Sequence, residues 1–269
     1  AIVVARLLGP AAVGEYGFAV VLIGYFQLFT DFGLGTLLTR EVAQDRSRAP
    51  RYYANILGLR LALVAISLPL LASLVALYWS AFNLTAAGAL TIAFFGLSLI
   101  PGALSASASA VFSAYEKMEY PALLTSIATL LRVALGLVAL LSGFGIAGLG
   151  FVALVVNVVI AVLFWLLLRT IFFQPRWQVD WNAARRLAVL AFPLMINNFL
   201  SSIFFRSDVL FLKPMQGDAA TGYYTTAYKF IDGLNIIPAF FTLAIFPLFS
   251  RYAVSSTESL VFAFTRSLK

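Results

Sequence analysis

The sequence predicts an all-α fold, a polytopic bundle of transmembrane helices, and three observations support this. Hydrophobic residues make up 62% of the 269 residues and charged residues only 11%, whereas soluble domains carry about a quarter charged residues. The mean hydropathy is +0.97. The apolar residues fall into stretches long enough to cross a bilayer, which takes roughly 20 residues in a helix. Because this number of charges is too small to cover a water-facing surface, we expect an integral membrane protein.

Glycine, proline and charged clusters divide the chain into eight apolar stretches, the first incomplete, and a ninth begins near residue 257. The eight are 1–8, 14–40, 52–78, 84–113, 119–141, 145–169, 184–212 and 219–249. Both ends of the chain interrupt an apolar run, so we expect a piece of a longer protein. Residues 1–180 are predicted to form an N-terminal transmembrane lobe with an incomplete first helix, and 181–269 the truncated start of a C-terminal lobe.

The connections between these stretches alternate in charge. Ten basic residues lie in or beside one set of connections, namely 40–51, 114–120, 169–186 and the segment from Arg251. The other set, 9–13, 79–83, 142–144 and 213–218, has only Arg6 and Lys213 nearby. Basic residues concentrate in cytoplasmic loops, so the first set is predicted to be cytoplasmic and the short turns to face outward.

A short pattern occurs twice in the outer turns. Six small or aromatic residues of "LLGPAAVGEYGFAV", which begins at Leu7, recur 208 positions later in "QGDAATGYYTTAY". Gly9 and Gly217 are expected to release the chain from one helix, because glycine tolerates positive φ. The two copies are six helices apart, an even number, so we predict two parallel bundles related by an axis along the membrane normal, as in some transporters.

Several predicted helices carry polar rows inside their spans. Ionisable groups there are costly and usually face a partner or a water-filled cavity. The polar rows of the predicted seventh helix span several turns, which is more typical of a water-filled wall than of an isolated pair. The residues concerned are Gln27 and Asp31; Tyr53, Arg60 and Ser67; Thr125, Thr129 and Arg132; Asn198, Ser202 and Arg206 beside Asn197, Ser201 and Asp208; and Tyr224, Tyr228, Asp232 and Asn235 with Lys229.

Each row also has a purely structural interpretation. Arg60 and Arg132 could extend toward an interface, Lys229 and Asp232 could neutralise each other, and small polar rows often serve helix packing. The row Ser98, Gly102, Ser105 and Ser109 is expected to serve packing in this way.

The composition excludes several kinds of chemistry. The chain has no cysteine and no histidine, which removes thiol chemistry and the common zinc and haem ligands. We find no nucleotide-binding loop, no paired carboxylates and no nucleophile–base set. We therefore predict no catalytic residues, no metal site, no cofactor and no enzymatic activity.

Several segments resemble the lipid-linked oligosaccharide flippases of the Wzx type. They are "ARLLGPAAVGEYGFA", "TDFGLGTLLTREVA", "FSAYEKMEYPALL" and the region from "FPLMINNFL" to "TTAYKF", which includes an Arg-x-Asp pair at Arg206 and Asp208. The resemblance covers nearly the whole chain and implies membership of the multidrug/oligosaccharidyl-lipid/polysaccharide exporter superfamily, whose members have two six-helix lobes around a central cavity.

The resemblance implies a transporter that flips an undecaprenyl-pyrophosphate-linked oligosaccharide across the bacterial inner membrane by alternating access, for polysaccharide or lipopolysaccharide biosynthesis. The expected partners are the lipid-linked oligosaccharide, membrane lipids and other polysaccharide assembly proteins, and no nucleic acid. The candidate cavity residues are Arg206, Asp208, Lys229, Asp232, Asp31, Arg132, Asn198 and Ser202.

Two other functions fit parts of the pattern. A cation-coupled drug exporter of the same superfamily would favour an acidic cavity, whereas the charges predicted within the membrane lean slightly basic. A membrane-embedded glycan polymerase or ligase would need a large outer loop, and the predicted outer turns are very short. The complete reading frame would separate these alternatives.

Overall fold

The computed structural model describes residues 2–77, 79, 84–175, 179–255, 261 and 264–265, and the secondary structure within these residues is helical. The elements are α1 (Ile2–Asp31), α2 (Leu34–Gln44), the short 3₁₀ helix η1 (Arg46–Arg48), α3 (Ala49–Leu77), α4 (Ala86–Ala114), α5 (Glu119–Leu141), α6 (Gly145–Ile171) and α7 (Trp181–Ser255). The predicted all-α membrane bundle is confirmed. The predicted ninth helix near 257 and the turn at 79–83 lie largely outside the described residues.

Six segments of the described residues are long and apolar enough to cross a membrane. The last of them, Trp181–Asn235, is 55 residues long, far more than the roughly 20 that one span needs. It contains the predicted turn at 213–218. Residues 181–223 belong to the same compact unit as the preceding helices, and the residues from Tyr224 onward form a second unit. The predicted lobe boundary at 180/181 stays a prediction.

The two glycines of the repeated pattern interrupt their helices in the same way. Gly9 in α1 has φ 78° and ψ 168°, and Gly217 in α7 has φ 80° and ψ −176°. This combination is accessible essentially only to glycine. The prediction that Gly9 and Gly217 release the chain through positive φ is confirmed, although each turn is a single non-helical residue.

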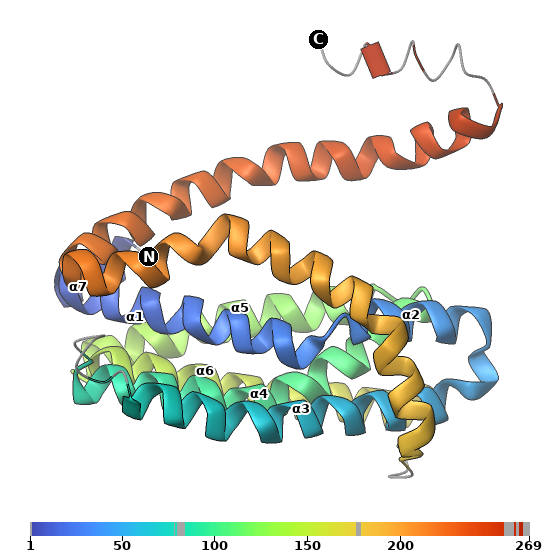
Figure 1. Ribbon diagram of the computed structural model, residues 1–269, viewed down its shortest axis with the longest axis horizontal. Helices are drawn as coiled ribbons and strands as arrows, with labels where there is room; N and C mark the ends of the chain where they lie inside the picture. Colours follow the sequence, from blue (N-terminus) through green and yellow to red (C-terminus); the bar gives the residue numbers. More distant parts are fainter. Residues whose placement is uncertain are drawn as a thin grey trace. The chain divides into compact units, whose positions relative to one another are not determined.

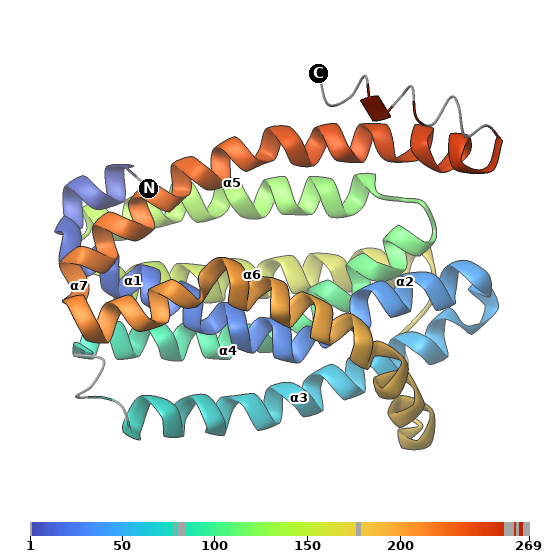
Figure 2. The same cartoon turned by 45° about the horizontal axis from the view of Figure 1, so that its top comes forward.

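Helix α4 lies at the centre of the first unit and contacts α1, α2, α3, α5 and α6. Figures 1 and 2 show α3, α4 and α6 running alongside one another. Two apolar clusters fill the space around α4. One joins α2 to the beginning of α3 and the ends of α4 and α6. The other joins α1 to the second half of α3 and the first half of α4.

Three basic connections meet at one end of this unit, which we call the basic end. Arg46 pairs with Glu116 at 3.5 Å, and the ring centroids of Tyr115 and Phe172 are 4.2 Å apart. Arg51 pairs with Asp180 at 3.0 Å. Asp180 caps α7, and the backbone N–H of Ala183, followed by the Arg51 guanidinium, holds the pKa of Asp180 below its usual value.

The predicted stretch 14–40 lies within one candidate membrane span, Leu7–Gln44, but its helix is interrupted between α1 and α2. Phe32 has φ 50° and Gly33 has φ 72°, so both leave the right-handed helical region. A Cβ on Gly33 would lie 2.7 Å from Cβ of Leu194. The break therefore lies directly against α7, whose backbone at Met195 and Ala191 is also within 3.2 Å of that Cβ position.

Candidate functional site

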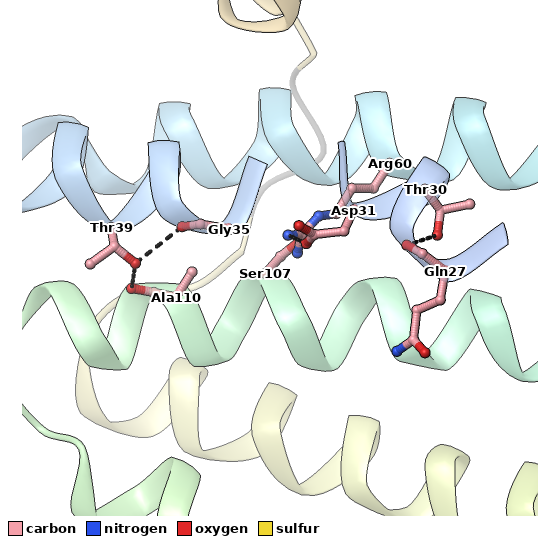
Figure 3. A network of polar contacts seen from close by, with 8 residues as sticks. All are labelled: Gln27, Thr30, Asp31, Gly35, Thr39, Arg60, Ser107 and Ala110. Atoms are coloured by element: carbon pink, nitrogen blue, oxygen red, sulfur yellow. Dashed lines mark hydrogen bonds and ion pairs between the residues drawn. The ribbon is translucent and has the colours of Figure 1, made fainter. Parts of the chain in front are cut away.

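The break between α1 and α2 is joined to α3 and α4 by a cluster of polar side chains. The Arg60 guanidinium forms an ion pair with Asp31, and its Nη1 donates a hydrogen bond to Ser107 Oγ at 2.9 Å. Figure 3 shows Arg60, Asp31 and Ser107 converging from three helices, while the Gln27 side chain points away. Thr39 Oγ1 contacts the carbonyl oxygens of Gly35 and Ala110 nearby.

This cluster lies between the two apolar clusters of the unit. On α3, Leu57 belongs to the first cluster and Val64 to the second, with Arg60 between them. Arg60 is 1% exposed, so it does not extend toward an interface, and the alternative raised for it from the sequence is wrong. Asp31 neutralises Arg60, which gives this carboxylate a structural contact within the helix bundle.

Helix α5 has a polar flank on one side and an apolar flank on the other. Thr125, Thr129 and Arg132 are all exposed and share one face of the helix, because residues three and four apart are neighbours. Leu123 and Leu130, which are 58% and 70% exposed, lie on another side. The Arg132 guanidinium donates a hydrogen bond to the amide oxygen of Asn157 on α6 at 2.6 Å.

Arg132 lies well inside its span. It is 13 residues after Glu119 (132 − 119) and 9 residues before Leu141 (141 − 132), which corresponds to about 20 Å and 14 Å along the helix axis. Its partner Asn157 is neutral, whereas the buried cations Arg60 and Lys213 pair with Asp31 and Asp218. The polar flank of α5 therefore carries a positive charge that its Asn157 contact does not neutralise.

The candidate residues on α7 are partly visible. Asn198 is exposed and Ser202 half-buried, and the Ser202 carbonyl accepts a hydrogen bond from Tyr25 at 3.3 Å. Asp208 is half-buried, and its Oδ1 accepts from the backbone N–H of Val209 at 2.8 Å. Lys229 is exposed and lies in the second unit. The side chains of Arg206 and Asp232 lie outside the described residues.

Two buried charges were missed by the sequence analysis as site residues. Glu15 is 4% exposed, and its carboxylate accepts hydrogen bonds from the backbone N–H of Thr85 at 2.6 Å and from Thr85 Oγ1 at 2.8 Å. It thus stands at the N-terminus of α4, where the helix dipole favours an anion. Lys213 is 1% exposed and pairs with Asp218. Lys213 belongs to a predicted outer turn and Glu15 lies two residues after one, where a charged side chain is expected to be solvated.

The described residues hold no group of three or more histidine, cysteine, aspartate or glutamate side chains placed to bind a metal ion. No curated protein and no solved structure matches the chain. A family described as polysaccharide biosynthesis protein matches residues 1–253, which is nearly the whole chain. The chain belongs to this polysaccharide biosynthesis protein family, the family of the Wzx-type flippases within the multidrug/oligosaccharidyl-lipid/polysaccharide exporter superfamily.

Proposed function

We propose that the protein flips a lipid-linked oligosaccharide, carried on undecaprenyl pyrophosphate, across the bacterial inner membrane by alternating access. The family membership supports a role as a flippase or exporter in polysaccharide biosynthesis. The observation that carries the substrate class is Arg132, a guanidinium deep in a spanning helix whose side-chain partner is the neutral Asn157. A group of this kind at mid-membrane faces a partner or a water-filled cavity.

The chemistry of Arg132 fits a pyrophosphate. A guanidinium offers two parallel N–H donors to phosphate oxygens, and lysine does not reproduce this geometry. Asn157 occupies one Nη2 hydrogen bond and so fixes the side chain while leaving other donors of the guanidinium to the ligand. Thr125, on the same face, adds a hydroxyl group suited to sugar or phosphate oxygens, whereas the Thr129 hydroxyl donates to the Thr125 carbonyl oxygen at 2.9 Å.

The structure changes the order of the candidate residues. Asp31 and Arg60 neutralise each other inside the bundle, so they contribute little net charge to a cavity. Arg132 becomes the first candidate for contact with the pyrophosphate. Arg206, Asp208, Lys229, Asp232, Asn198 and Ser202 stay candidate cavity residues.

A reconstituted flipping assay tests this function. The full-length protein in vesicles is given an undecaprenyl-pyrophosphate oligosaccharide, and the fraction reaching the other leaflet is measured. Arg132→Gln is expected to reduce the rate by about ten- to a hundredfold, the equivalent of one charged hydrogen bond. Arg132→Lys should retain part of the activity, because it keeps the charge but loses the paired donors.

The control is Arg169→Gln. Arg169 lies in the last turn of α6 and stacks over Trp165 at 5.5 Å, so its loss should leave flipping near the normal rate. Normal flipping by Arg132→Gln at normal abundance would overturn the role of Arg132. Transport of a cationic drug in place of the lipid-linked oligosaccharide would instead support the drug-exporter alternative.

A further inference from the structure

The two copies of the repeated pattern contact each other through the same residues. A Cβ on Gly14 would overlap the carbonyl oxygen of Asp218 and lie 2.8 Å from the backbone nitrogen of Gly222. A Cβ on Gly222 would overlap the carbonyl oxygen of Pro10 and lie 3.1 Å from the backbone nitrogen of Gly14. Asp218 and Gly222 are the positions of the second copy that correspond to Pro10 and Gly14 of the first, so each copy presents the same two positions to the other. We call this contact the glycine crossing.

The glycine crossing has the form of a two-fold contact. In such a contact the same patch is used by both partners, so that each interaction occurs twice. The two segments that meet in the glycine crossing begin at Pro10 and Asp218. Each of them directly follows a glycine with the same unusual backbone conformation, Gly9 or Gly217. The absence of a side chain at Gly14 and Gly222 lets the two backbones touch. The contact therefore needs glycine at both positions.

One buried cation, Lys213, contacts both copies, and the equivalent position in the first copy holds no cation. Lys213 pairs with Asp218 of the second copy, and its Nζ lies 5.4 Å from the centre of the Phe18 ring in the first copy. The positions 208 residues earlier than Lys213 and Asp218 are Ala5 and Pro10, which cannot form an ion pair. Lys213 thus adds to the reciprocal glycine contacts an electrostatic link whose equivalent positions in the first copy, Ala5 and Pro10, cannot form one.

We propose that the glycine crossing is a gate between the two repeat copies at the end opposite the basic end, and that Lys213 latches it. This inference rests on the proposed transport function, because a flippase must part its two halves at one end to release its substrate. Closure depends on direct contact between backbones, so the gate is sensitive to the volume of a single methyl group at Gly14 or Gly222.

The latch is suited to reversible opening. Burying an ion pair costs desolvation energy that the attraction between the charges only partly offsets. When the copies part, Phe18 moves away from Lys213, and water solvates both Lys213 and Asp218. The closed state is favoured by the pair and the cation–π contact, while the open state recovers hydration. Breaking the pair on opening therefore costs less than the attraction between the two charges alone would suggest.

The accessibility of a buried reporter tests the gate without requiring any substrate. Thr221 is 0% exposed and directly precedes Gly222, so Thr221→Cys reports on separation of the copies in the full-length protein freed of other cysteines. The measurement is the rate at which a membrane-impermeant maleimide, added to intact cells, labels the thiol at position 221. Gly14→Val and Gly222→Val are each expected to accelerate labelling by about tenfold or more, since overpacking a contact costs 1–3 kcal/mol.

Gly24→Val is the matched control. It lies on the same helix as Gly14, and a Cβ there would meet nothing within 4 Å, so labelling of the reporter thiol at position 221 should be unchanged. Unchanged labelling in Gly14→Val and Gly222→Val, with the protein present at normal abundance, would overturn the gate.

Lys213→Met provides a second variant that adds no volume to the crossing. It removes the latch, leaves Asp218 without its cation and should also accelerate labelling. If the valine variants fail to accumulate, the proposal is tested by Lys213→Met alone. Labelling in this variant that is no faster than in Thr221→Cys alone contradicts both the latch and the gate. Labelling does not depend on glycan transport. A failed Arg132 test would therefore leave this result standing, and a failed gate test would leave the proposed substrate untouched.

Discussion

At the scale of single residues, the close contact between Gly88 and Glu15 decides how α4 begins. The Glu15 carboxylate occupies the space that a Cβ on Gly88 would fill. There it accepts two hydrogen bonds from Thr85, while Thr85 Oγ1 caps the helix by accepting from the backbone N–H of Gly88 at 3.1 Å. A buried carboxylate with these donors is satisfied only while Gly88 has no side chain.

Gly88→Ala is expected to displace Glu15 and to lower stability by about 1–3 kcal/mol, the cost of leaving a buried polar group unsatisfied. The measurement is the midpoint of thermal unfolding of the purified protein in detergent. Gly102→Ala in the same helix is the control, because a Cβ there meets nothing within 4 Å and alanine favours a helix. Equal midpoints for the two variants would contradict the role of Gly88.

Sequence reasoning reached some of these residues and missed others for a physical reason. Gly9 and Gly217 were predictable, because a turn needs positive φ locally and the spacing of small residues recurs. Glu15 was not predictable as a cap, since its partner Thr85 lies 70 residues away. Nothing in "AVGEYG" indicates which helix N-terminus lies beside it.

At the scale of elements, the ion pair of Asp31 and Arg60 accounts for a break that the sequence did not reveal. Glycines at 33 and 35 in "DFGLG" are compatible with one continuous helix as well as with a break. The choice depends on Arg60 from α3 and on the close approach of α7 at Leu194. Both are tertiary contacts between residues distant in sequence, so a local pattern cannot predict them.

Neutralising the two partners should have unequal effects. Arg60 is 1% exposed and the Asp31 side chain 36% exposed. Asp31→Asn leaves a fully buried guanidinium without its counter-ion, a change that costs about 3–5 kcal/mol in other buried pairs. Arg60→Met leaves the Asp31 carboxylate unpaired, but this carboxylate is less buried than the guanidinium. We therefore expect Asp31→Asn to reduce folded protein more than Arg60→Met does.

The double variant Asp31→Asn/Arg60→Met provides the matched comparison. With no unpaired charge left, it should recover much of the stability lost in Asp31→Asn, as measured by monodisperse protein in detergent and by the thermal midpoint. If Asp31→Asn is as stable as the unmodified protein but transports nothing, Asp31 acts in the cavity and not in holding the break.

At the scale of the whole molecule, the charge pattern of the connections was a good guide to which of them lie together. The predicted cytoplasmic connections 40–51, 114–120 and 169–186 are linked by Arg46–Glu116 and Arg51–Asp180. The predicted outer turns 9–13 and 213–218 also lie at one end of the unit, because Pro10 contacts Gly222, four residues after the second turn, and Asp218 contacts Gly14, directly after the first. The alternation of basic and neutral loops thus predicted the neighbours correctly. The contact between the two repeat copies could not be predicted, because it depends on how the helices pack.

Which end faces the cytoplasm follows from membrane physics, and it can be measured. The basic end carries the cations that favour retention on the cytoplasmic side. Ser47 at the basic end and Ser142 at the opposite end are both exposed, so Ser47→Cys and Ser142→Cys form a matched pair in a chain without native cysteines. An impermeant maleimide added to intact cells should label the Ser142→Cys variant and leave the Ser47→Cys variant unlabelled until the membrane is permeabilised. Labelling of the Ser47→Cys variant alone would reverse the orientation, and the glycine crossing would then be a gate on the cytoplasmic side.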